Sequence, residues 1–331
     1  MKKLFNEVER VVPEMLHGMV RAHSHLISLL PGTQVVVRAQ KKEENKVAVI
    51  SGGGSGHEPA HAGFVGKGLL DAAVAGLIFA APSLNDVMAA IRHCSGPGGI
   101  LFVVKNYTGD RILFDMAEEE AQNLGIPVRQ VVVADDVAVD DPSRRRGVAG
   151  TVFVHKVAGA MAEMGESLEK VHAVAQKAAS SVRTMGIALS PCTIPGNIRP
   201  NFDLAEDEIE IGIGIHGEAG VQRGKIRPVR ELVSEMLERI MSDFPLSPGE
   251  EVAVLVNGMG STPLMELYIA FDNVADILAS RGIRIYRSYV GEFMTSLDMA
   301  GFSVTLLRLD EELKALLNYP CTAPAWTQAL P

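Results

Sequence analysis

Residues 47–63, VAVISGGGSGHEPAHAG, carry an apolar run into a series of glycines and then into two histidines and a glutamate. The β-branched residues before Ser51 predict a strand over residues 46–50 that is buried on both faces. Glycine occupies four of the six positions 51–56, which we expect to end that strand and form a ligand-binding turn. Glycine tolerates positive φ angles and lets backbone N–H groups approach a ligand closely.

The glycine turn fits neither of the common phosphate-binding motifs. A P-loop would place Lys followed by Ser or Thr after the glycines, and the dinucleotide motif requires Gly-x-Gly-x-x-Gly. Glycine also follows strands for steric reasons alone, so the turn by itself is weak support for a ligand site. His57 strengthens the functional interpretation, because it would lie at the carboxyl end of a strand, where open α/β sheets bind ligands.

The composition limits the class of protein. The chain has 331 residues, of which 47% are hydrophobic and 21% charged, which predicts two globular domains. A net charge of −9 without an extended basic cluster argues against a nucleic-acid partner. No apolar run reaches the roughly 18 residues of a membrane span, and the N-terminus does not resemble a signal peptide. Three widely spaced cysteines indicate a reduced, cytoplasmic protein.

Alternating strand and helix patterns predict an α/β fold with two domains, each a mostly parallel or mixed sheet flanked by helices. We expect an N-terminal domain over residues 1–183 and a C-terminal domain over residues 184–331. The expected strands cover residues 35–37, 73–79, 99–104, 128–133, 251–257, 283–289 and 302–309. The expected helical segments cover residues 3–30, 57–70, 84–91, 114–125, 148–164, 168–182 and 231–241.

Three turns place ionisable side chains directly after expected strands. These residues are His57, Glu58 and His61 in the first turn, Lys105 and Asp110 in the second, and His216 and Glu218 in the third. A histidine beside a carboxylate can act as a general base or a nucleophile, although any single histidine is more often structural. A zinc site is a competing use, but Pro59 disfavours a helix that would bring His57 and His61 onto one face.

These turns belong to a series of motifs that closely resembles the dihydroxyacetone-binding subunits of dihydroxyacetone kinases, of the type that depends on the phosphotransferase system. The resemblance runs in order from residue 1 to about residue 325. The motifs lie at residues 51–61, 104–110, 145–149, 212–218, 256–264 and 295–302.

The resemblance implies a homodimeric subunit that holds dihydroxyacetone as a covalent hemiaminal on a histidine ring nitrogen, here His216. It implies a catalytic pair, His57 and Asp110, that acts on the terminal hydroxyl of the substrate. It further implies that the backbone of Gly54, Ser55, Gly56 and His57, together with Lys105, binds the substrate, with Asp110 and His216 completing the site. Glycerol has no carbonyl group and would not form the hemiaminal.

The resemblance also implies that the phosphoryl donor lies on a partner. The short tail after Leu309 has no room for a nucleotide-binding domain. We therefore expect no cofactor and no metal in this chain, and ADP or ATP with Mg²⁺ on a nucleotide-binding L subunit. A phosphocarrier of the phosphotransferase system would act on that subunit, so its contact with this chain is indirect. Use of free ATP by such a pair remains the alternative.

Two positions depart from the family pattern. Ala81 stands where a small polar residue commonly helps to hold the substrate, and the loop over residues 140–146 is short. A lost hydroxyl contact is worth about 1 kcal/mol, which leaves a four-carbon ketose as an alternative substrate. A noncatalytic co-regulator that binds dihydroxyacetone is a second alternative, although it would not need His57 and Asp110. A zinc hydrolase is a third.

Overall fold

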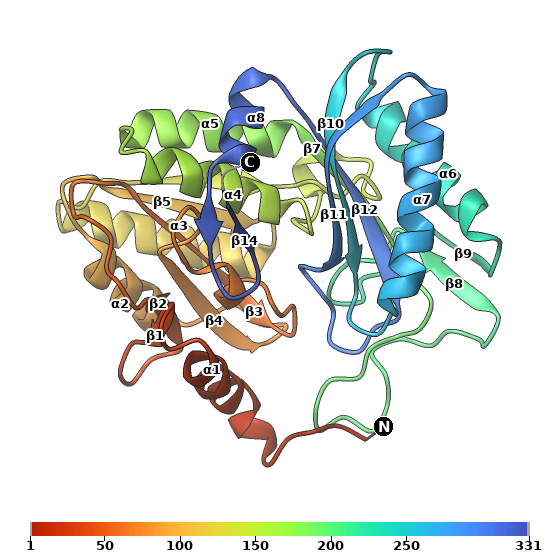
Figure 1. Cartoon of the computed structure of the whole chain (residues 1–331). Helices are drawn as coiled ribbons and strands as arrows, with labels where there is room; N and C mark the ends of the chain where they lie inside the picture. Colours follow the sequence, from red (N-terminus) through yellow and green to blue (C-terminus); the bar gives the residue numbers. More distant parts are fainter. Residues whose placement is uncertain (1, 330–331) are drawn as a thin grey trace. The chain divides into compact units, whose positions relative to one another are not determined.

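The chain forms two compact units in a computed structural model that describes residues 2–329 (Figure 1). The N-terminal unit comprises Lys2–Val133, Thr151–Ala179 and the chain from Glu312 onward. The C-terminal unit comprises Ala134–Gly150 and Ser180–Glu311. The two units interleave along the chain, whereas the sequence predicts one boundary between residues 183 and 184.

A six-stranded mixed sheet with the order β1-β2-β4-β3-β5-β6 forms the centre of the N-terminal unit. Its strands are β1 (Ile27–Leu29), β2 (Val35–Arg38), β3 (Ala48–Ser55), β4 (Ala72–Ile78), β5 (Ile100–Lys105) and β6 (Val128–Val133). β3 pairs in parallel with both β4 and β5, while β1 and β2 are antiparallel additions at one edge. The carboxyl end of β3 therefore lies where the strand order changes direction, which is the usual ligand position in such sheets.

Helices cover both faces of this sheet. They are α1 (Val11–Ala22), α2 (Leu84–Cys94), α3 (Thr108–Asn123), α4 (Thr151–Glu163), α5 (Leu168–Ser180) and α8 (Glu311–Asn318), with a short ribbon of β13 (Cys321–Thr322) and β14 (Thr327–Gln328). Ile50 and Phe102 pack with residues of α2 and α3 in one buried cluster. Side chains alternate along a strand, so Ser51, Gly53 and Lys105 belong to the opposite face.

β3 continues through the glycines to Ser55, so the prediction that the strand ends before Ser51 is wrong. Gly52 and Gly53 pair with Val74 and Ala75 of β4. A Cβ atom on Gly52 would lie 2.5 Å from the carbonyl oxygen of Val74, closer than any stable contact. Close packing between β3 and β4 thus requires glycine inside the strand, and the turn begins only after Ser55.

Two predicted helical segments are shorter than expected. Residues 57–70 contain only a 3₁₀ turn over Ala62–Phe64 between irregular segments, and Pro59 lies in the first of them. The N-terminal segment is helical over Val8–Ala22, after which β1 forms an antiparallel pair with β2. The hydrophobic spacing of residues 23–30 is compatible with a helix, but pairing of β1 with β2 makes Ile27–Leu29 extended.

The C-terminal unit contains a second mixed sheet, with the order β11-β10-β12-β7-β8-β9. Its strands are β7 (Val182–Ala188), β8 (Glu208–Ile211), β9 (Gln222–Lys225), β10 (Glu251–Gly258), β11 (Arg284–Glu292) and β12 (Gly301–Arg308). Only β10 and β11 pair in parallel. The predicted fold class, two α/β sheets flanked by helices, is confirmed.

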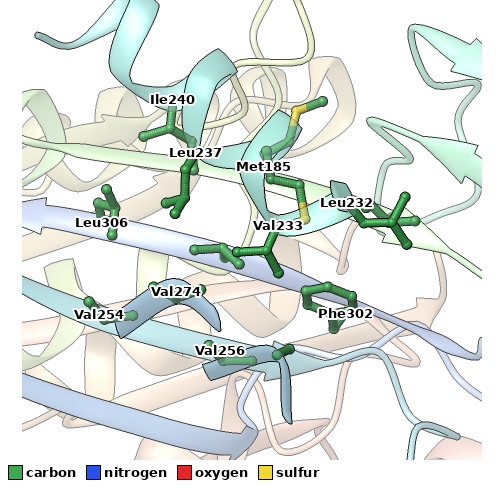
Figure 2. Packing of buried hydrophobic residues seen from close by; sticks show 14 of the residues in the cluster. Met185, Leu232, Val233, Leu237, Ile240, Val254, Val256, Val274, Phe302 and Leu306 are labelled. Carbon is green, nitrogen blue, oxygen red and sulfur yellow. The ribbon is translucent and has the colours of Figure 1, made fainter. Parts of the chain in front are cut away.

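Two helices, α6 (Val229–Asp243) and α7 (Leu264–Ser280), pack on this second sheet. Figure 2 shows Val233 and Leu237 of α6 in one buried cluster with Val254 of β10 and Leu306 of β12. Helix α7 is not among the helical segments expected from the sequence. No helix within residues 2–329 combines the length and the apolar character needed to cross a membrane.

Candidate functional site

His57 follows β3 directly and is buried in the N-terminal unit. Its ring stacks on Phe79, with the ring centroids 5.2 Å apart and an interplanar angle of 23°. Phe79 has a φ angle of 57°, which is uncommon for a residue other than glycine. Gly54 makes this arrangement possible, because a Cβ atom there would lie 2.9 Å from the Cα atom of Phe79.

Lys105 and Asp110 come together above Gly53. Lys105 is the last residue of β5, and Asp110 lies in the first turn of α3. A Cβ atom built on Gly53 would lie 3.1 Å from Nζ of Lys105 and 3.3 Å from Oδ2 of Asp110. Both side chains are buried, and the ammonium group also lies 5.5 Å from the ring centroid of Tyr107. A buried cation and a buried carboxylate therefore both lie close to the backbone of Gly53.

Two polar groups where β3 leads into the turn, the Ser55 hydroxyl and the Gly56 N–H, have partners within the chain. The N–H of Gly56 donates to both carboxylate oxygens of Glu58, at 3.2 and 3.1 Å. The hydroxyl of Ser55 donates to the carbonyl oxygen of Gly76 at 2.7 Å. Burial raises the pKa of the Glu58 carboxyl, while hydrogen bonds from its own N–H and that of Gly56 oppose the rise. A carboxylate on the Gly56 N–H shows that this turn accepts an anionic oxygen.

His216 lies in the C-terminal unit, in the loop after β8, and forms a pair with Glu218. Its Nδ1 atom lies 2.8 Å from Oε1 of Glu218, and its backbone N–H donates to Oε2 at 2.9 Å. Burial would raise the pKa of Glu218, but the hydrogen bond and charge of His216 hold it at about 2. The carboxylate can only accept, so Nδ1 is the donor, and in the neutral form of the imidazole the lone pair lies on Nε2.

The loop around His216 has little room for side chains. Asn201 donates its amide N–H to the carbonyl oxygen of His216 at 2.9 Å. Gly217 has a φ angle of 83°, and a Cβ atom there would lie 1.9 Å from that amide nitrogen. Arg146 donates to the carbonyl oxygen of Gly212 at 2.8 Å and to Asp136 at 2.7 Å. These contacts fix the loop and with it the direction of the imidazole.

The basic run at residues 144–146 is largely structural. Arg145 forms an ion pair with Asp243 of α6, and Arg146 with Asp136. Ala81 lies next to α3. A Cβ atom built on Gly109, in the first turn of that helix, would lie 3.4 Å from the Cβ atom of Ala81. Position 81 thus adjoins the turn that carries Asp110.

The structure places the predicted residues in two groups. The glycine turn, His57, Lys105 and Asp110 belong to the N-terminal unit, and His216 belongs to the C-terminal unit. Sequence reasoning missed Phe79, Asn201 and His155, because nothing in the local pattern distinguishes them from ordinary packing residues. Among the residues that the structure describes, no group of three or more His, Cys, Asp or Glu side chains is arranged to hold a metal ion.

Comparisons with known proteins identify the family of the chain. The Dak1 domain family matches residues 17–325. The chain is 48% identical to the dihydroxyacetone-binding subunit DhaK of PTS-dependent dihydroxyacetone kinase 1 from Listeria innocua, over 98% of this chain and 100% of that protein.

Two solved structures are similar over nearly the whole chain. The dihydroxyacetone kinase from C. freundii, in complex with AMP-PNP and Mg²⁺, superposes with a TM-score of 0.93 at 37% identity, over 100% of this chain and 62% of that one. The dihydroxyacetone kinase operon co-activator DhaQ superposes with a TM-score of 0.91 at 37% identity, over 98% of this chain and 99% of that one.

Proposed function

This chain belongs to the Dak1 domain family, and from that premise we propose that it is the substrate-binding subunit of a dihydroxyacetone kinase. In this proposal His216 holds dihydroxyacetone covalently while a phosphoryl group passes to the terminal hydroxyl, which yields dihydroxyacetone phosphate. The observation that carries the proposal is the pair of His216 and Glu218, in which the carboxylate keeps the proton of the neutral imidazole on Nδ1 and therefore the lone pair on Nε2.

Capture begins when the lone pair of Nε2 adds to the ketone carbon of the substrate. A C–N bond forms, the C=O π bond breaks, and the oxygen takes a proton from water to become a hydroxyl, which the later loss of the Nδ1 proton to water balances. The imidazole carries a positive charge until its Nδ1 proton leaves. The Glu218 carboxylate, 2.8 Å from Nδ1, stabilises that charge and can accept the proton. The mechanism therefore selects compounds with a reactive carbonyl and leaves glycerol unbound.

Transfer requires the hydroxyl oxygen of captured dihydroxyacetone to attack the terminal phosphorus of the donor nucleotide. His57 accepts the proton that the hydroxyl loses, and the bond between that phosphorus and its bridging oxygen breaks to release the nucleoside diphosphate. Asp110 orients the hydroxyl, while Lys105 and the backbone from Gly54 to His57 bind the substrate. The buried ammonium group above Gly53 would also stabilise developing phosphate charge.

The donor lies on a partner in this proposal. ATP or ADP with Mg²⁺ would be held by a nucleotide-binding L subunit, and a phosphocarrier of the phosphotransferase system would recharge it. The Listeria relative is named as one subunit of a PTS-dependent kinase, and the C. freundii kinase, bound to AMP-PNP and Mg²⁺, is longer than this chain. We further propose that the protein is cytoplasmic and forms a homodimer. Light scattering on the purified protein tests the dimer directly.

Mixing this chain with an L subunit, dihydroxyacetone and a phosphoryl source tests the proposal. The expected product is dihydroxyacetone phosphate, formed with a charged phosphocarrier and absent without the L subunit. Formation with ATP alone, at a rate that the phosphocarrier does not change, would identify the free-ATP alternative. Failure to form product in every combination would contradict the kinase assignment.

The similarity to the co-activator DhaQ supports one alternative, a noncatalytic subunit that binds dihydroxyacetone and reports it. Such a protein would capture the substrate in the same assay and turn nothing over. A four-carbon ketose is the other alternative, because Ala81 supplies no hydroxyl beside the Asp110 turn. A higher kcat/KM for erythrulose than for dihydroxyacetone would favour it.

A further inference from the structure

His61 and His155 form a buried pair on the face of the sheet that carries Ser51, Gly53 and Lys105. They are 94 residues apart in the chain, and Nδ1 of His61 lies 3.0 Å from Nε2 of His155. His61 follows the glycine turn, and His155 lies in α4 (Figure 1). The two rings meet edge to face, with centroids 5.2 Å apart. Neither histidine has a role in the proposed reaction.

The hydrogen-bond pattern fixes the tautomer of His61. The hydroxyl of Ser51 donates to the carbonyl oxygen of Val103 at 2.7 Å, so its oxygen can only accept from His61 Nδ1, 3.4 Å away. The Nδ1–H of His61 is therefore the donor, shared between Nε2 of His155 and Ser51. Within residues 2–329, neither Nε2 of His61 nor Nδ1 of His155 has a hydrogen-bond partner, so this arrangement leaves the His61 lone pair and the His155 N–H buried without one.

Both rings are electrically neutral near pH 7. Burial, and then the charges of Lys105, His155 and His57, lower the pKa of His61 well below its ordinary value. Burial and the charge of Lys105 lower the pKa of His155 to about 3. The pair therefore adds no charge beside Lys105, and its contribution is one of hydrogen bonding and shape.

We propose that His61 and His155 are positioning residues for His57 in the phosphoryl-transfer step. His61 lies four residues after His57 in the same irregular segment, which neither a regular helix nor a strand stabilises. His61 is tied to β3 through Ser51 and to α4 through His155. The segment that carries the proposed base is thereby attached to two rigid elements. This inference rests on the proposed kinase function.

The test uses two single substitutions at each histidine. One retains an atom that can make the hydrogen bond, and the other removes that atom. Asn at position 61 retains a donor near Nδ1, and Gln at position 155 retains an acceptor near Nε2. The variants His61→Leu and His155→Met fill similar volumes without the bond. We expect the last two to lower kcat about 10- to 100-fold, since misplacement of a reacting group by about 1 Å has effects of that size.

Substrate capture provides the second readout. We expect covalent capture of dihydroxyacetone, which the proposed function assigns to His216 alone, to be unchanged in all four variants. His61→Asn and His155→Gln should recover most of kcat. The matched control is His172→Leu, which removes a half-buried histidine of α5 that lies 3.2 Å from the carbonyl oxygen of Gln130. Its kcat should equal that of the wild type.

Ring resonances of His57 separate this inference from the kinase proposal. In imidazole NMR spectra, His155→Met should shift the His57 signals and His172→Leu should not. Unchanged His57 signals and unchanged kcat in folded His155→Met would overturn the inference, as would a loss of kcat that His155→Gln fails to restore. A wild-type protein that turns nothing over would instead overturn the kinase proposal, and the His57 signals would still decide whether the pair positions His57.

Discussion

Nδ1 of His216 lies 2.8 Å from Oε1 of Glu218, two residues further along the same loop. The carboxylate also accepts the backbone N–H of His216 at 2.9 Å, so it fixes both the ring and the main chain. This relationship decides which ring nitrogen can react, because a carboxylate that accepts from Nδ1 places the lone pair of the neutral imidazole on Nε2. The proposed covalent capture depends on it.

Replacement of His216 by Ala should abolish covalent capture, because no other described residue of that loop offers an imidazole. The phosphoryl-transfer rate with the L subunit should fall to the level of unanchored substrate. Isotope-labelled dihydroxyacetone and NMR detect the loss of the tetrahedral adduct. Residual adduct in a folded His216→Ala protein would place the capture elsewhere.

Replacement of His57 by Ala should leave capture largely intact and lower the rate of phosphoryl transfer about 10²- to 10⁴-fold, the usual contribution of a general base. The reason is that His57 acts on the terminal hydroxyl and makes no bond to the ketone carbon. Parallel assays of capture and turnover check this division of roles. An equal loss of both activities in His57→Ala and His216→Ala would contradict it.

Replacement of Gly53 by Ala should disturb Lys105 and Asp110 together. The new Cβ atom would lie 3.1 Å from Nζ of Lys105 and 3.3 Å from Oδ2 of Asp110, and the residue has a φ angle of 155°. We expect a loss of turnover with capture at His216 unchanged. Gly18→Ala is the matched control, since nothing lies within 4 Å of its Cβ position in α1.

The control itself makes a stability prediction. Ala replaces Gly inside an exposed helix, which should raise the free energy of unfolding by about 0.5–1 kcal/mol. Urea unfolding of Gly18→Ala, Gly53→Ala and the wild type measures how each substitution changes the free energy of unfolding. A turnover defect in Gly18→Ala as large as that in Gly53→Ala would contradict a specific effect of the Gly53 substitution on Lys105 and Asp110.

The pH dependence of stability tests the His216 and Glu218 pair. The pKa of Glu218 is about 2 in the folded chain, against an ordinary value of 4.5, so the folded state binds fewer protons between these values. The stabilisation is complete above about pH 5 and is lost as the pH falls from about 4.5 toward 2. The difference in urea midpoint between wild type and Glu218→Gln should therefore shrink below pH 4.5. An equal difference at pH 3 and pH 6 would contradict the pair.

The sequence predicted the fold class and the residue types of the site better than it predicted local geometry. Strands β5 and β6 are short segments rich in valine and bounded by turn residues, and such segments can be recognised from the local sequence alone. The length of β3 was mispredicted, because glycine normally ends a strand and only the proximity of β4 explains its presence inside one. The contact between β3 and β4 determines where β3 ends, and no local sequence pattern encodes that contact.

Pairs that are distant in the chain were beyond sequence reasoning for the same reason. His216 and Glu218 are two residues apart, and the pattern of glycine, histidine and carboxylate indicated their pairing. His61 and His155 are 94 residues apart, and His155 sits in an apolar helix without any local signal. Phe79, which stacks on His57, follows the end of β4, and its local sequence predicts only an ordinary core residue. Single-sequence patterns locate turns but not their long-range partners.

The most direct test of covalent capture is an NMR spectrum of dihydroxyacetone labelled with ¹³C at the ketone carbon, bound to protein labelled with ¹⁵N in its histidines. We expect a tetrahedral carbon signal that is split by one-bond coupling to Nε2 of a histidine ring and that is absent in His216→Ala. A bound ketone signal without nitrogen coupling, or coupling that persists in His216→Ala, would contradict it.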